Sequence, residues 1–454
     1  MFKKFVGPSK FFNLKEIYDE STLEIEVNED KIVESNARKG KNIRFMDLIF
    51  TSQNWHESIW KHRARIYIPE NYQNDGNVGI IGAHMDFIPE KNYIVGGEAV
   101  KNMPHLARGT IIGSDNLGTE AEFCEGTAID LRIPIMLFNT PGDIIFGLDE
   151  SDLMGYGLKK LGETFDMTWF PYLPIVKSYL RAIALLHSIP EIKAQRAVLF
   201  GNSKRGVSVS IATGVDPDRI AGILCTGAHG GNTLYMTLMK YAQLGPNIGG
   251  PAIERMGPGF LPAERLLEIL NSPAGFFLLM NFDPYIWRQQ IKSSYMIAIG
   301  TNDEFTGLGT PDGMIKNFEG DKAILYIDNL PHTWTSIKHL SAWKMWLAHI
   351  YRGRDIPIIK LKAETINSTL KITVFAKSST EIRNVKLYYS FNNTSDWRFA
   401  KWEYITLDKE NKSYICSLDL MSDMNLAYYV EVEDFDDSSG FGYISSLIEF
   451  IRKL

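Results

Sequence analysis

The 454-residue sequence has few cysteines, no long apolar run and no excess of positive charge. Its three cysteines, Cys124, Cys225 and Cys416, are isolated, and no CxxC or other zinc-ligand spacing occurs. We therefore expect neither a disulfide framework nor a cysteine-ligated metal. No window approaches about 18 uncharged apolar residues, which argues against a membrane-spanning helix.

The charge balance removes a further class of partner. Lysine and arginine total 48 against 54 aspartates and glutamates, a net charge of −6, so nothing favours a nucleic-acid partner. Lys3 and Lys4 are not followed by an apolar segment, so the N-terminus does not match a signal peptide. We expect a cytoplasmic protein. The sequence alone determines neither export nor a protein partner.

Composition and length predict a large globular chain. Hydrophobic residues make up 45% and charged residues 22% of the sequence, as in ordinary folded domains. At roughly 100–200 residues per domain, two to four domains are expected. A chain of this length buries enough apolar surface to fold without a structural metal.

Short apolar runs alternate with helical patterns through the first part of the chain. Leu173–His187 and His339–Tyr351 carry apolar residues three to four positions apart, which predicts helices. Runs without polar alternation are typical of strands covered on both faces, and the pattern as a whole predicts a doubly wound α/β fold with a mostly parallel sheet. The predicted strands are Arg65–Pro69, Val78–Ala83, Ile133–Phe138, Ala197–Gly201, Ile220–Thr226, Tyr295–Thr301 and Lys322–Ile327.

Two regions break this alternation. Residues of about 228–290 contain predicted helices at Thr233–Leu244 and Pro262–Leu270, which we interpret as a helical insertion able to form a lid, with ordinary helical packing as the alternative. After a linker at 352–357, short alternating runs separated by turn clusters predict a β-sandwich of immunoglobulin or fibronectin style. We assign residues 1–353 to the α/β domain and 358–454 to the sandwich. The predicted sandwich strands are Lys371–Phe375, Val385–Ser390, Lys401–Leu407, Ser413–Leu418, Ala427–Val432 and Gly442–Ile448.

The most informative motif follows the predicted strand Ala197–Gly201. Gly201-Asn202-Ser203-Lys204-Arg205-Gly206 leads from that strand into a predicted helix at 207–212. This arrangement resembles the nucleophile elbow of α/β-hydrolases, in which a serine on a sharp strand-to-helix turn projects from the sheet edge. The pattern departs from Gly-x-Ser-x-Gly, because Arg205 occupies the second position after the serine. The alternative is an ordinary turn in which Ser203 caps the helix.

A serine nucleophile needs a base and an orienting acid, and α/β-hydrolases carry them in the order serine, acid, histidine. Asp303 follows the strand Tyr295–Thr301, and His332 follows the strand Lys322–Ile327. We assign Ser203, Asp303 and His332 as the catalytic triad. Asp312 and Glu304 stay as rival acids, Asp312 more simply as a turn residue or a helix N-cap.

The remaining candidates concern the oxyanion hole and the substrate. The backbone N–H of Lys204 and a second N–H from the loop after Ala83, at Met85 or His84, would stabilise an oxyanion. Lys204 and Arg205 are candidates for contacting an acidic substrate group or the oxyanion. The alternative for either cation is a structural salt bridge, and for His84 a place in the pocket wall.

These motifs resemble those of the PhoPQ-activated pathogenicity-related family of predicted α/β-hydrolases over roughly residues 45–340, and the family tends to carry a β-rich C-terminal extension. The elbow looks like that family's Gly-Ala-Ser-Lys-Arg-Gly. The other matching segments are Thr51–Trp55, Trp60–His62, Tyr67–Pro69, Pro174–Ala184, Asp216–Arg219, Asp283–Tyr285, Gly300–Thr306, Pro311-Asp312 and His332.

The resemblance implies Ser203 as nucleophile, Asp303 as acid and His332 as base, without implying a substrate. The sequence departs from the family pattern at Val207–Val209, where tryptophan and threonines are expected, and in lacking an export signal. The charged residue after the serine is also similar to that of glucuronoyl esterases, which recognise acidic sugars.

We therefore expect a serine hydrolase that cleaves an ester, thioester or amide in a small-molecule or peptide substrate, without a metal or organic cofactor. The alternative function is a non-catalytic α/β-hydrolase scaffold that binds a ligand or a protein.

Overall fold

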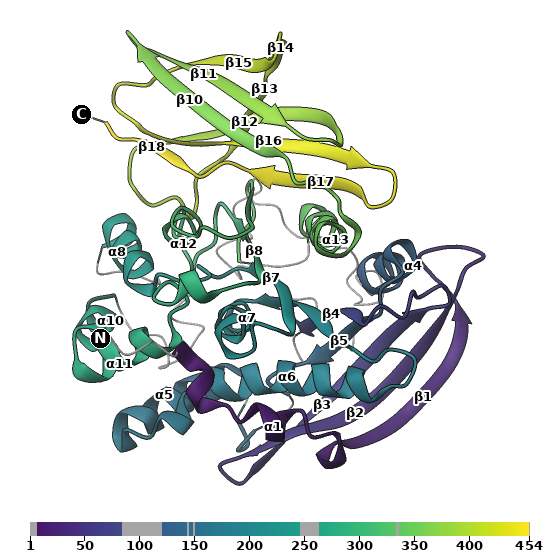
Figure 1. The fold of residues 1–454 in the computed structure, drawn as a ribbon. Helices are drawn as coiled ribbons and strands as arrows, with labels where there is room; N and C mark the ends of the chain where they lie inside the picture. The colour runs from purple at the N-terminus through teal and green to yellow at the C-terminus, as the bar shows by residue number, and fades with distance from the viewer. Residues whose placement is uncertain are drawn as a thin grey trace, which may run out of the picture.

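The computed structural model describes residues 7–83, 120–142, 145–148, 150–245, 263–332 and 336–453. These residues form a nine-stranded sheet with helices on both faces and, beyond it, two further antiparallel sheets (Figure 1). The strands of the large sheet are β1 (Glu24–Glu34), β2 (Asn42–Trp55), β3 (Ser58–Pro69), β4 (Asn77–Ala83), β5 (Ile135–Asn139), β6 (Arg196–Asn202), β7 (Ile220–Thr226), β8 (Ser294–Gly300) and β9 (Lys322–Ile327).

The strand order of the large sheet is β1-β2-β3-β5-β4-β6-β7-β8-β9. The pairs β1–β2, β2–β3 and β3–β5 are antiparallel. The pairs from β5–β4 to β8–β9 are all parallel. With the added edge strand β1 set aside, this is the strand order of the α/β-hydrolase fold. The predicted fold class is therefore confirmed, and the carboxyl ends of β6 to β9 lie together at one edge of the sheet.

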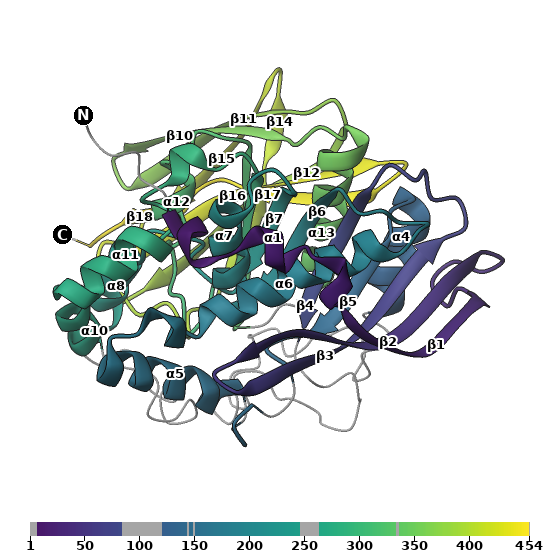
Figure 2. The same cartoon turned by 60° about the horizontal axis from the view of Figure 1, so that its bottom comes forward.

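Helices cover both faces of the sheet. Leu199 of β6 packs into the core under α6 and α7, whereas Val198 and Phe200 face the core under α4 and α13. Figure 2 shows the first of these faces, with α1 lying across α6. The α-helices are α1 (Leu14–Ile17), α4 (Gly126–Leu131), α5 (Glu150–Thr164), α6 (Tyr172–Ser188), α7 (Lys204–Val215), α8 (Thr233–Leu244), α10 (Ala263–Leu270), α11 (Pro273–Phe282), α12 (Asp312–Ile315) and α13 (Ile337–Arg352). Among the described residues, none of the helices is both long and apolar enough to span a bilayer.

Short helices of other types connect these elements. They are the 3₁₀ segments η1 (Gly7–Phe11), η2 (Glu20–Thr22), η4 (Met167–Trp169) and η6 (Arg288–Gln290) and the π-helical segment η3 (Glu120–Glu125). The seven predicted strands of the large sheet are all present. The predicted insertion contains α8 with the predicted bounds, followed by α10 and α11, while residues 246–262 lie outside the described ranges.

Five strands were not expected from the sequence: β1, β2, β10 (Ile358–Ile366) and the three-residue strands β14 (Asp408–Glu410) and β18 (Glu449–Ile451). Almost every residue of β1 is exposed, so its side chains give no apolar run. In β2, buried polar residues such as Asp47 and Ser52 interrupt the apolar pattern, and their side chains are satisfied by partners on β3. Burial of polar groups depends on those partners, so the strand is recognisable only once β3 is in place.

The C-terminal strands form a β-sandwich. One sheet has the order β10-β11-β15-β14 and the other β13-β12-β16-β17, with β18 also paired to β16. Side chains from both sheets share one core, for example Ile372 and Val374 facing Leu387 and Val430. The strands are β10 (Ile358–Ile366), β11 (Thr369–Lys377), β12 (Glu381–Asn392), β13 (Glu403–Thr406), β14 (Asp408–Glu410), β15 (Ser413–Asp419), β16 (Asn425–Asp436), β17 (Gly440–Ser445) and β18 (Glu449–Ile451).

Ion pairs to buried carboxylates join the sandwich to the α/β part near α13, which lies beside β17 (Figure 1). Lys338 Nζ lies 2.8 Å from Glu431 Oε2 and 3.0 Å from Asp328 Oδ1, and Glu431 is 1% exposed. Beyond the end of α13, Arg354 Nη2 donates to Asp434 Oδ1 at 2.8 Å, with both side chains buried. Such pairs need complete partnering in a dry environment, so they fix the relative position of the two parts.

We predict that Lys338→Met destabilises the protein by about 3–5 kcal/mol, because the Glu431 carboxylate is left buried without its cation. Urea unfolding followed by tryptophan fluorescence measures the change. Lys362→Met is the matched control, since Lys362 pairs with Glu364 on the exposed surface, and it should leave the midpoint essentially unchanged. Equal midpoints for the two variants would contradict the role given to Lys338.

Candidate active site

Ser203 lies on the turn between β6 and α7 in a strained backbone conformation. Its φ is 56° and its ψ −121°, values that a non-glycine residue rarely adopts. The Ser203 N–H donates to Thr226 O at the end of β7 at 2.9 Å, which ties the turn to the neighbouring strand. The predicted strand, sharp turn and helix are therefore present at this motif.

Two glycines make this turn sterically feasible. A Cβ on Gly201 would lie 2.5 Å from the carbonyl carbon of Arg205, and a Cβ on Gly206 would lie 3.0 Å from Gly201 O and from Thr226 O. The contact at Gly201 is closer than a side-chain carbon tolerates, and the contacts at Gly206 are tighter than nearly all Cβ contacts in proteins. The displaced glycine of the motif thus serves a close backbone approach, while Arg205 takes the position before it.

Asp303 lies in the turn after β8 and is 3% exposed. Its Oδ1 accepts hydrogen bonds from the backbone N–H groups of Phe305 (2.9 Å) and Thr306 (2.7 Å). Burial opposes the charge of this carboxyl, but attraction to His332 and the hydrogen bonds outweigh it and hold the Asp303 pKa below its usual range. Asp303 is therefore a carboxylate with one oxygen committed to the backbone.

His332 lies after β9, and its Nδ1 is 2.8 Å from Asp303 Oδ2. The carboxylate only accepts, so Nδ1 carries the proton and Nε2 has the lone pair in the neutral ring. The backbone N–H of His332 donates to Glu304 Oε2 at 2.9 Å. Burial disfavours the imidazolium, yet the Asp303 charge and hydrogen bond, assisted by Glu304, raise the His332 pKa overall.

The histidine and the elbow meet around Gly227, just after β7. A Cβ on Gly227 would lie 2.6 Å from Asn202 Oδ1 and 3.0 Å from His332 Cε1. The imidazole therefore lies beside the strand end that carries Ser203. The charge of Lys204 also reaches His332 and opposes its protonation, which agrees with this proximity.

The rival acids occupy other environments. Asp312 Oδ1 accepts from the Tyr326 hydroxyl at 2.6 Å and Oδ2 from the Ile448 N–H at 3.1 Å, so it links α12 and β9 to the sandwich. Burial raises the Asp312 pKa to about 7. The expected cap role is not observed, because Pro311 is the N-cap and Asp312 the first residue of α12. Burial also raises the Glu304 pKa, and Glu304 contacts the His332 backbone rather than its ring.

Of the remaining candidates, Arg205 and Lys204 belong to the described residues. Arg205 is 4% exposed, and its Nε donates to Thr140 O at 2.5 Å, so it braces the turn after β5. Lys204 begins α7, and its carbonyl oxygen accepts from the Ser208 hydroxyl at 2.9 Å. His84 and Met85 lie outside the described residues. Within the described ranges, no group of three His, Cys, Asp or Glu side chains could hold a metal ion.

The residues of the family motifs that lie on β2 and β3 stabilise the end of β5. His62 is fully buried; its Nδ1–H donates to Asn139 O at 2.6 Å, and the Ser52 hydroxyl lies 2.8 Å from Nε2. The Asn139 side chain accepts from the Arg63 N–H at 2.7 Å. Burial lowers the His62 pKa to about 4, so the ring stays neutral. This serine–histidine pair is thus a structural element behind Thr140, the partner of Arg205.

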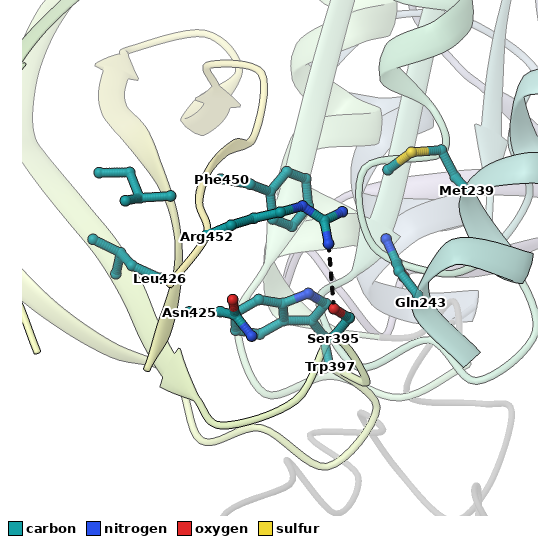
Figure 3. Close-up of a pocket in the computed structure, with 9 residues that line it drawn as sticks. Met239, Gln243, Ser395, Trp397, Asn425, Leu426, Phe450 and Arg452 are labelled. Atoms are coloured by element: carbon teal, nitrogen blue, oxygen red, sulfur yellow. Dashed lines mark hydrogen bonds between the residues drawn. The ribbon is translucent and has the colours of Figure 1, made fainter. Parts of the chain in front are cut away.

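A small pocket lies between α8 and the sandwich rather than at the triad (Figure 3). Trp397, Phe450 and Met239 supply apolar walls, and the Arg452 guanidinium lies 3.5 Å from the Ser395 hydroxyl. Neither Ser203 nor His332 lines it.

Because Asp303 favours the imidazolium, His332 should titrate above its ordinary pKa of about 6.5 in NMR measurements of the ring Cε1–H. Asp303→Asn should move this pKa down. A raised pKa stabilises the folded state below about pH 6.5, and that contribution is lost as the pH rises through the folded value. A His332 pKa that is unchanged in Asp303→Asn would contradict the electrostatic assignment.

Known structures share this architecture only remotely. A glucuronoyl esterase from Solibacter usitatus matches at 13% identity and a TM-score of 0.44, covering 74% of this chain and 90% of its own. Acetyl xylan esterase 1 from Thermoanaerobacterium sp. matches at 12% identity and a TM-score of 0.39, covering 73% of this chain and 92% of its own. Candida antarctica lipase A matches at 12% identity and a TM-score of 0.39, covering 77% of this chain and 86% of its own. Likenesses this distant carry no argument about activity.

Sequence comparison is more decisive. No curated protein matches the chain. The sequence profile of the PhoPQ-activated pathogenicity-related protein family matches residues 27–398, which include the elbow, Asp303, His332 and the first strands of the sandwich. The chain belongs to the PhoPQ-activated pathogenicity-related protein family.

Proposed function

We propose that the chain is a serine hydrolase that cleaves an ester, thioester or amide through an acyl-enzyme. The observation that carries the proposal is the 2.8 Å Asp303–His332 hydrogen bond beside the strained Ser203 turn. Backbone strain of this kind costs about 1–3 kcal/mol and persists where the surroundings enforce it. A helix cap alone would not require it, and the Ser203 side chain makes no capping hydrogen bond.

Each side chain has a role that follows from its environment. His332 Nε2 takes the proton of the Ser203 hydroxyl as the oxygen attacks the carbonyl carbon, and later gives it to the leaving group. Asp303 holds the Nδ1–H tautomer and stabilises the imidazolium that forms. Its own low pKa keeps it ionised throughout.

The start of α7 supplies the positive potential that an oxyanion needs. The Lys204 N–H follows the nucleophile directly, at the N-terminal end of a helix whose dipole favours negative charge. We propose this N–H as one donor of the oxyanion hole. The second donor, at Met85 or His84, remains the prediction made from the sequence.

A fluorophosphonate probe tests the nucleophile without knowledge of the substrate. We predict one covalent adduct, mapped to Ser203 by peptide mass spectrometry and absent from Ser203→Ala. Ser208→Ala, which changes a serine of α7 five residues after Ser203, is the control and should label normally. An intact wild-type protein that stays unlabelled while a reference hydrolase reacts would favour the non-catalytic scaffold.

The identity of the acid is tested by comparing two aspartates. Asp303→Asn should slow fluorophosphonate labelling on the order of 10⁴-fold, because the amide favours the wrong histidine tautomer. Asp312→Asn should have little effect, since Asp312 contacts Tyr326 and Ile448 instead. A time course of labelling at pH 8 gives the rates of both variants. A larger loss in Asp312→Asn than in Asp303→Asn would identify Asp312 as the acid.

A further inference from the structure

Two asparagines connect the triad loops to the C-terminal sandwich. Asn302 directly precedes Asp303, and Asn329 lies between β9 and His332. Both side chains reach the same stretch of backbone, residues 397–402, which we call the bracing segment. It runs between β12 and β13 of the sandwich.

The amide nitrogen of Asn302 is directed at the carbonyl groups of this segment. Its Nδ2 donates to the carbonyl oxygens of Ala400 (2.8 Å), Arg398 (3.1 Å) and Trp397 (3.3 Å). The residue is 2% exposed, so water does not compete for these acceptors. A buried amide with three carbonyl partners has one orientation, and its backbone continues directly into Asp303.

Asn329 makes a reciprocal pair with Trp402. Its Oδ1 accepts from the Trp402 N–H at 2.9 Å and its Nδ2 donates to Trp402 O at 3.0 Å. The side chain thereby imitates a neighbouring strand. Asn329 has a φ of 51°, a left-handed conformation that asparagine tolerates better than most residues.

The two asparagines are also linked to each other. The Asn329 N–H donates to Thr301 Oγ1 at 3.0 Å, and the Thr301 hydroxyl donates to Asn302 Oδ1 at 2.8 Å. The Asn302 N–H donates to Leu330 O at 3.1 Å. The acid loop, the histidine loop and the bracing segment therefore form one closed hydrogen-bond network, in which Asn302 is buried and Asn329 half-buried.

The bracing segment is itself held firmly by the sandwich. The Ser390 hydroxyl donates to Lys401 O at 2.8 Å, and the Arg398 guanidinium forms two hydrogen bonds with Asp396. Trp397 and Trp402 are 4% and 3% exposed. The segment can act as a fixed support rather than as a flexible loop.

We propose that the bracing segment, through the positioning residues Asn302 and Asn329, sets the relative position of Asp303 and His332. The sandwich is then part of the framework of the active centre. This inference rests on the proposed hydrolase function for its catalytic consequence, whereas the geometry of the Asp303–His332 pair can be tested independently. The loops of acid and base follow different strands, and errors of about 1 Å between them cost on the order of 10²-fold in rate.

The test compares full-length Asn302→Ala and Asn329→Ala with Ser445→Ala. Ser445 is the matched interface control, because its buried hydroxyl accepts from the Tyr326 N–H at 3.0 Å, away from the triad loops. For each variant that keeps the wild-type circular dichroism and melting profile, fluorophosphonate labelling rates are measured between pH 5 and 9. The expected result is a loss on the order of 10²-fold for either asparagine variant, with the pH inflection moved down, and wild-type behaviour for Ser445→Ala.

Proton NMR tests the geometry of the Asp303–His332 pair without depending on catalysis. Wild-type protein should show a strongly deshielded His332 Nδ1–H resonance, which disappears in His332→Ala, and the asparagine variants should weaken or shift it upfield. If the wild type is not labelled but this resonance responds as expected, the hydrolase proposal fails and the bracing role stands. A normal resonance together with an unmoved His332 titration in the asparagine variants would overturn the bracing role.

If one asparagine variant fails to fold, the other variant still tests the proposal. Asn302→Ser, which keeps a small polar group, also tests it. Because both asparagines belong to one network, the double variant should lose less than the product of the two single losses. Single variants that label at the Ser445→Ala rate would also overturn the proposal.

Discussion

The hydrogen bond between Asp303 and His332 is the interaction around which the candidate site is organised. It joins two loops that follow neighbouring parallel strands, β8 and β9, so the sheet register brings them to the same edge. Backbone N–H groups hold one oxygen of Asp303, and Glu304 holds the backbone of His332. With both groups anchored, the carboxylate directs its other oxygen at the imidazole and sets its tautomer.

Polar contacts support this pair from the sandwich side. Apolar packing is tolerant of small shifts, whereas a buried amide without its partner loses the full hydrogen-bond energy. Asn302 and Asn329 therefore define positions more sharply than leucines of similar size would. The ion pairs of Lys338 and Arg354 act at a larger scale, since they hold α13 against the sandwich strands.

The turn that carries Ser203 depends on a comparable set of supports from other parts of the chain. Gly201 and Gly206 allow the close backbone approach, and Arg205 connects α7 to Thr140 at the end of β5. His62 and Ser52 hold the preceding residue, Asn139. Residues far apart in the chain thus converge on one short turn.

The sequence by itself determined the parallel strands, the elbow motif and the order of the triad candidates, because buried strands are continuous apolar runs and a sharp strand-to-helix turn needs glycines close to the serine. It did not reveal β1, whose exposed side chains carry no burial signal, or β2, whose polar residues are paired with β3. Only the tertiary structure showed that Asp303 contacts the His332 ring whereas Asp312 contacts Tyr326, since both aspartates follow the same predicted strand and local pattern gives no distance between side chains. It alone also showed the task of Asn302 and Asn329, because their partners lie about 70 to 100 residues away and local pattern carries no information about long-range hydrogen bonds.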